Sequence, residues 1–285
     1  MADGAASAMP RRLRQALAAA GLIALAIAAL LSGTDRQSRE FPSAPSVIGW
    51  PYDTGAARAR AISAFVQSGP KSAIAFARRA ILSDPISAQP ISLLGRSQLY
   101  AGQAQEARKT FEVAGQLGWR DGMTQIYWLD QALQMGDIKV AAERLDALLR
   151  QSPRDENRDR FLAIVSATPE GRAAIAQRLK AVPTWAEVYV GDVKDLPAEQ
   201  LAQRADVVLR TGRGVWPCSA SAIITQKLID SNMLAEAQAV WRGTCAASNS
   251  LVFDGGFDQL DTTMATRGFD WQLSSRGDVD VRPTM

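Results

Sequence analysis

A regular repeat of small and apolar residues in the first half of the chain constrains the fold more than any other feature. Small and apolar residues of the segment 91–119 align with residues of similar kind 34 positions earlier and later. Ala107, for example, aligns with Ala73 and with Ala141. Such a period indicates one supersecondary unit that is repeated and whose copies stack in a line. The spacing therefore predicts stacked pairs of short helices, which need no single globular core.

This pattern resembles the tetratricopeptide repeat (TPR), in which each unit is a pair of antiparallel helices. We assign TPR-like repeats to residues 54–153, as three hairpins, and degenerate helical repeats to residues 154–249. The resemblance implies an all-α fold, a TPR-like α-solenoid of antiparallel helix pairs.

The resemblance also implies a binding surface, because TPR-like arrays hold extended segments in a concave groove lined by the first helix of each pair. Transferred position by position, the groove residues are Arg58, Gln89, Arg96, Tyr100, Ile126 and Asp130. We expect Arg58 and Arg96 to hold carboxylates or a polar backbone, and Tyr100 and Ile126 to make apolar contacts. The alternative is that these positions are ordinary solvent-facing residues.

The N-terminus indicates the compartment. An arginine cluster at 11–14 precedes an uncharged run over 15–31, and the segment 13–33 is long enough to cross a bilayer, which needs about 20 residues. Basic flanks stay in the cytoplasm, so residues 1–12 are expected there and the rest of the chain outside. This predicts a single-pass protein of a bacterial inner membrane with its bulk in the periplasm.

Two interpretations of the apolar segment stay open, an uncleaved signal-anchor and a cleaved signal peptide. The small residues at its end are Ser32 and Gly33, a poor fit to an A-x-A cleavage site, which favours the anchor. Residues 34–53 are polar and contain three prolines, so we expect a linker there.

The two cysteines flank the last predicted helix pair. Cys218 opens its first helix and Cys245 closes its second, and these two ends of an antiparallel hairpin are neighbours. Because the predicted compartment is oxidising, we expect a disulfide. A metal site, which would need more ligands, and a catalytic thiol, which would need a base, are the alternatives.

Several chemical functions find no support in the sequence. The chain has no histidine, which removes the commonest general base and most zinc sites. It has no Walker loop, dinucleotide fingerprint or G-x-S-x-G motif. The formal net charge of +3 is too small to argue for nucleic acid. We therefore expect no enzyme, cofactor, metal or nucleic-acid partner; an enzyme with an unrecognised acid/base pair is an alternative.

The pattern changes over residues 250–285, where short runs separated by glycine and aspartate predict strands and turns. The sequences DGGFD at 254–258 and GFDW at 268–271 resemble the opening strands of β-sandwich modules of the carbohydrate-binding type. That resemblance implies contact with a polysaccharide. For the aromatic residues of this segment we favour packing in a core over a sugar-binding role.

The function that we expect is a non-enzymatic, membrane-anchored periplasmic scaffold that binds protein partners through the groove. The resemblance at the C-terminus favours envelope polysaccharide assembly or export as its process. A carbohydrate-binding protein with the helical repeats as a stalk is the alternative.

Overall fold

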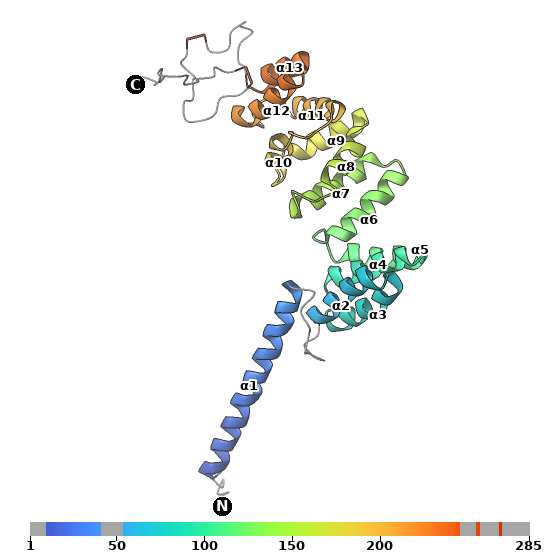
Figure 1. The fold of residues 1–285 in the computed structure, drawn as a ribbon, viewed down its shortest axis with the longest axis vertical. Helices are drawn as coiled ribbons and strands as arrows, with labels where there is room; N and C mark the ends of the chain where they lie inside the picture. The colour runs from blue at the N-terminus through green and yellow to red at the C-terminus, as the bar shows by residue number, and fades with distance from the viewer. Residues whose placement is uncertain (1–9, 41–53, 246–254, 257–267, 270–285) are drawn as a thin grey trace, which may run out of the picture. The chain divides into compact units, whose positions relative to one another are not determined.

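The computed structural model describes residues 10–40, 54–245, 255–256 and 268–269 (Figure 1). Within these residues it contains thirteen α-helices and no strand, which confirms the predicted helical class. The predicted β segment lies outside the described residues, apart from two short turns.

The chain divides into unit 1, Met1–Thr124, and unit 2, Gln125–Met285. The boundary falls within α6 (Gly122–Gln134). The helices of unit 1 are α1 (Arg11–Glu40), α2 (Thr54–Gln67), α3 (Pro70–Ser83), α4 (Ala88–Tyr100) and α5 (Ala104–Gln116). The helices that begin in unit 2 are α7 (Ile138–Gln151), α8 (Arg158–Ser166), α9 (Pro169–Leu179), α10 (Ala186–Gly191), α11 (Ala198–Thr211), α12 (Cys218–Asp230) and α13 (Leu234–Thr244).

Helix α1 is long and apolar enough to cross a membrane over Arg11–Gln37, and none of its most apolar stretch is buried. It continues to Glu40, so the first part of the predicted linker is helical instead. The physical reason is that no proline interrupts the chain before Pro42. The hydroxyl of Thr34 also finds its acceptors within the helix, so it does not compete for the helix backbone N–H groups.

The starts of the helices repeat the sequence period. Helices α2, α4 and α6 begin at Thr54, Ala88 and Gly122, so their starts are equally spaced and the interval equals the period of the sequence. The second helices of the same pairs, α3, α5 and α7, begin at the same interval from one another. The period predicted from the sequence is therefore a period of helix pairs.

Small residues let the helices of unit 1 approach closely. Ala61, Ala77 and Leu93 form one buried cluster that joins α2, α3 and α4. Gly95 of α4 faces Phe111 of α5, and a Cβ atom there would lie 2.9 Å from the phenylalanine ring. The shape of these pairs thus depends on side chains that fill little space.

The core of unit 2 is built from larger side chains. Leu145, Leu149 and Leu179 are almost completely buried in it, together with Trp185 and Tyr189. Tyr189 belongs to the short helix α10.

Candidate functional site

A cluster of one arginine and two aromatic rings lies on α2 and α4 of unit 1. The guanidinium carbon of Arg96 lies 4.9 Å from the centroid of the Phe65 ring and 5.7 Å from that of Tyr100. The two rings meet edge to face with their centroids 5.4 Å apart. Arg96 and Tyr100 are one turn apart on α4, so they share a face of that helix. The rings hold the guanidinium group through its attraction to their π faces.

Both polar members of this cluster face solvent. Arg96 is exposed and has no carboxylate partner among the residues that the structure describes. Tyr100 is 65% exposed. A planar, charged donor beside an accessible aromatic ring can bind a carboxylate or backbone carbonyls.

A second contact joins the same two helices. The Nη1 group of Arg58 on α2 donates a hydrogen bond to Oε1 of Gln89 on α4. The structure thus brings together the four predicted groove residues of unit 1 in two contacts, Arg58 with Gln89 and Arg96 with Tyr100.

The two remaining groove residues lie on α6 in unit 2. Ile126 is partly buried against the core of that unit, and Asp130 is exposed and accepts a hydrogen bond of 2.6 Å from Nε2 of Gln134. Their participation in one groove with the residues of unit 1 stays a prediction.

The sequence around the arginine–aromatic cluster is basic. Residues 54–100 contain six lysines and arginines, and their one acidic residue is Asp84. A surface with so few carboxylates of its own favours a partner that supplies them.

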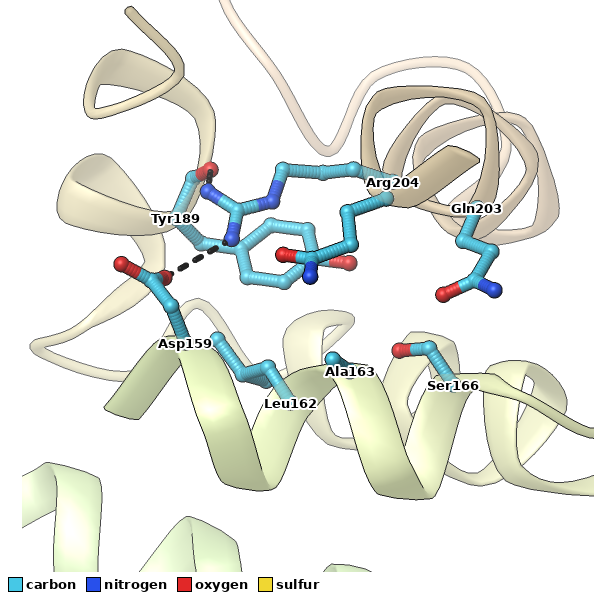
Figure 2. A pocket seen from close by; sticks show the side chains of 8 residues that line it. Asp159, Leu162, Ala163, Ser166, Tyr189, Gln203 and Arg204 are labelled. Carbon is cyan, nitrogen blue, oxygen red and sulfur yellow. Dashed lines mark hydrogen bonds and ion pairs between the residues drawn. The ribbon is translucent and has the colours of Figure 1, made fainter. Parts of the chain in front are cut away.

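Unit 2 contains a polar network that the sequence analysis missed, centred on Arg204 of α11 (Figure 2). Its Nη1 group donates to the carbonyl oxygens of Tyr189, at 2.9 Å, and Asp192, at 3.0 Å. Its Nη2 group donates to Oδ1 of Asp159 at 3.1 Å, and its guanidinium carbon lies 4.5 Å from the centroid of the Tyr189 ring. Arg204 is buried, and these contacts compensate for the loss of water.

The surroundings of Asp159 and Tyr189 keep the first charged and the second neutral near neutral pH. Burial tends to raise the pKa of Asp159, but the hydrogen bond and charge of Arg158 and the charge of Arg204 hold that pKa below its usual value. Burial raises the pKa of the Tyr189 phenol far above its usual value, so the ring stays neutral. Neither group is suited to exchange protons near neutral pH.

A small pocket lies beside the network. Figure 2 shows Asp159, Tyr189 and Arg204 on its wall, and Ser166 and Gln203 also line it. The centre of a water-sized sphere has about 10 Å³ in which to move, so the pocket has room for about one water molecule. The network therefore acts as a structural connection between helices, and the pocket is too small for an organic ligand.

Other ion pairs of unit 2 connect residues about one period apart. Arg158 pairs with Asp192, and Arg172 pairs with Asp206, each across 34 residues of sequence. Opposite charges at the repeat spacing are the sequence signal that would have revealed these pairs. They show that residues one period apart lie next to each other in this half of the chain.

The two cysteines meet as predicted. The structure places Cys218 and Cys245 at disulfide distance, with their Cα atoms 5.1 Å apart. Beside them, the ring of Phe269 packs against Trp241 with centroids 6.3 Å apart, so this C-terminal aromatic residue makes a packing contact. No group of three or more potential metal ligands occurs among the described residues. The rest of the predicted sugar-binding segment lies outside them.

We compared the chain with protein-family models, with curated proteins and with solved structures, and none of the three comparisons found a match.

Proposed function

We propose that this protein is a membrane-anchored scaffold that binds protein partners on the face formed by α2 and α4. The observation that carries this proposal is Arg96, which two aromatic rings hold at the surface while no described carboxylate neutralises it. The contacts with the two rings stabilise the fold by about 0.5–1 kcal/mol each at most, and they leave the hydrogen-bond donors of the guanidinium group available to a partner. Arginine and tyrosine are also among the side chains most enriched at the centres of protein interfaces.

The proposed architecture is a TPR-like α-solenoid. Two observations support it: the helix starts that follow the sequence period, and the ion pairs of unit 2 that connect residues one period apart. In such an array the first helix of each pair lines the concave surface, and α2 and α4 are the first helices of their pairs.

The proposed location is a bacterial inner membrane, with α1 as a single uncleaved span and the following helices in the periplasm. The support is the length of α1, its exposed apolar side chains and the arginines at its start. A disulfide between Cys218 and Cys245 fits an oxidising compartment.

The proposed ligand is an extended protein segment that carries carboxylates. The basic composition of residues 54–100 supports this choice. The absence of histidine from the sequence supports action by binding rather than by catalysis. Envelope polysaccharide assembly or export is the process that we favour, on the C-terminal sequence resemblance alone.

Site-specific photo-crosslinking in cells tests the proposal. A photoreactive phenylalanine analogue at Tyr100 of the full chain should yield a discrete crosslinked protein. The double variant Arg58→Glu, Arg96→Glu should lose at least nine-tenths of it, because a single charged hydrogen bond contributes about 1.5–3 kcal/mol.

The matched control is Arg108→Glu. Arg108 is an exposed arginine on α5, a second helix, where it pairs with Glu112 at 3.3 Å. This variant should leave the crosslinked product unchanged. Equal crosslinking in the double variant and the control would refute the proposed surface.

A further inference from the structure

The helix that would cross the membrane is joined to the first hairpin by a cap. One carboxylate oxygen of Asp35, on α1, accepts hydrogen bonds from the backbone N–H groups of Gly55, at 2.8 Å, and Ala56, at 3.3 Å. These are orphan donors of the first turn of α2, so Asp35 acts as an N-cap supplied by another helix. Its side chain is buried by this contact.

This cap fixes the depth of the hairpin. The apolar run of α1 ends at Leu31, and Asp35 follows one helical turn later, about 6 Å along the axis. The headgroup layer on each side of a bilayer is roughly 5–8 Å thick. With Leu31 at the edge of the hydrocarbon, the first turn of α2 therefore lies at the depth of the lipid headgroups.

The last turn of α3 lies beside that first turn of α2, because the two helices are antiparallel and joined by a short turn. This end of the hairpin exposes two aliphatic side chains, Leu82 at 86% and Ile86 at 82%. Arg78 is exposed one turn before Leu82 on the same face of α3. An aliphatic pair flanked by a basic side chain is the composition of an interfacial membrane contact.

The other repeats provide an internal comparison. One and two periods after Leu82 the chain has Gln116 and Arg150, and after Ile86 it has Arg120 and Arg154. All four are exposed or partly exposed, at the positions where Leu82 and Ile86 are exposed. At these two positions the aliphatic residues occur in the hairpin attached to α1 and are replaced by polar residues in the next two. The same end of the second hairpin exposes Leu117 at 43% and Trp119 at 49%, each less than Leu82 and Ile86.

We propose that the end of the first hairpin, at Leu82 and Ile86, rests in the headgroup layer of the bilayer that α1 enters, and that Asp35 holds it there. This inference rests on the proposed membrane anchor. It makes α1 and the first hairpin one rigid, membrane-apposed base that sets the orientation of the α2–α4 surface.

Spin labelling of the full chain in vesicles of phosphatidylcholine and phosphatidylglycerol tests it. Nitroxides are attached to Ile86→Cys and, as the matched control, to Arg120→Cys, with Cys218 and Cys245 kept oxidised. The label at 86 should collide more with oxygen and several-fold less with a water-soluble nickel complex than the label at 120. Equal accessibility at the two positions would overturn the inference.

Two variants of Asp35 test whether its cap is what holds the end of the first hairpin against the bilayer. Asp35→Ala removes the cap and should make the label at 86 as accessible to nickel as the label at 120, while Asp35→Asn keeps an acceptor oxygen and should preserve the difference. A label that stays lipid-exposed in Asp35→Ala would contradict the role of Asp35.

Alkaline carbonate extraction of the membranes tests the anchor itself. Release of the chain would refute the anchor together with this inference, whereas an anchored chain with a water-exposed label would refute the inference alone.

Discussion

Unit 1 and unit 2 each contain an arginine that packs against a tyrosine ring, but Arg96 of unit 1 is exposed whereas Arg204 of unit 2 is buried. Residues 54–124 contain nine lysines and arginines against four aspartates and glutamates, whereas residues 125–245 contain fifteen of each. In unit 2, three arginines pair with carboxylates that lie far from them in the sequence. Arg172 pairs with Asp206 on α11, Arg204 with Asp159 on α8, and Arg158 with Asp192, which directly follows α10. In unit 1, Arg96 is held by aromatic rings instead.

This difference teaches how the same side chain can serve folding or recognition. A buried arginine whose donors are satisfied within the chain stabilises the packing of its neighbours and has no capacity left for a ligand. An exposed arginine that is positioned by rings keeps its charge and its donors available. We therefore propose that Arg96 serves recognition, whereas the buried arginines of unit 2, such as Arg204, stabilise the fold.

The largest expected effect on stability is that of removing Arg204. The variant Arg204→Met keeps the aliphatic stem but leaves two carbonyl oxygens without this donor and removes one of the donors of Asp159, which Arg158 still binds. This should lower the free energy of unfolding by about 3 kcal/mol. Chemical denaturation of the detergent-solubilised full chain measures it. The control Arg210→Met, which breaks an exposed pair within one helix, should cost less than about 0.5 kcal/mol. Equal losses would remove the distinction between buried and exposed arginines.

Two glycine variants compare how tightly the helices of unit 1 and unit 2 are packed. A Cβ at Gly171 in unit 2 would lie 1.7 Å from the carbonyl oxygen of Val165, which the backbone cannot relieve, whereas at Gly95 in unit 1 it meets the movable ring of Phe111. Gly171→Ala should therefore cost about 2 kcal/mol or more, and Gly95→Ala about 1 kcal/mol. Thermal unfolding of the two variants measures both. A larger loss for Gly95→Ala would contradict this account of the two cores.

Acid should weaken unit 2 through its ion pairs. Burial would raise the folded-state pKa values of Asp159 and Asp206, but hydrogen bonds and charges from arginines outweigh it and lower both pKa values. Such groups stabilise the fold above their unfolded pKa of about 3.9, and this contribution is lost as the pH falls through the folded pKa.

Hydrogen exchange between pH 6 and pH 3 measures this loss, after correction for the intrinsic rates. Protection of α8 and α11 should fall by less than about 1 kcal/mol, since both carboxylates are a third or more exposed and therefore screened. In the double variant Asp159→Asn, Asp206→Asn the pH dependence should flatten, and peptides of α4 and α5 provide the reference. If the protection of α8 and α11 in that variant fell with pH as steeply as in the unchanged chain, these ion pairs would not be the cause of the acid sensitivity.

The sequence predicted the helix pairs well and the network of unit 2 poorly, for a physical reason. The repeat period is a signal carried by the local pattern of small and apolar residues, and the observed helix starts agree with it. The cap from Asp35 and the bonds of Arg204 join residues 12 to 45 positions apart, and no local pattern encodes such contacts. The predicted groove residues came from the resemblance, which supplied the face of each helix; four of them lie on α2 and α4, and the groove itself stays a prediction.

Mapping the bound partner tests the central claim most directly. The crosslinked complex, purified in mild detergent, is compared with the free chain by hydrogen exchange. We predict added protection in peptides of 54–67 and 88–100, with peptides of 158–211 unchanged. Added protection confined to 158–211, with none on α2 and α4, would contradict the assignment of recognition to unit 1.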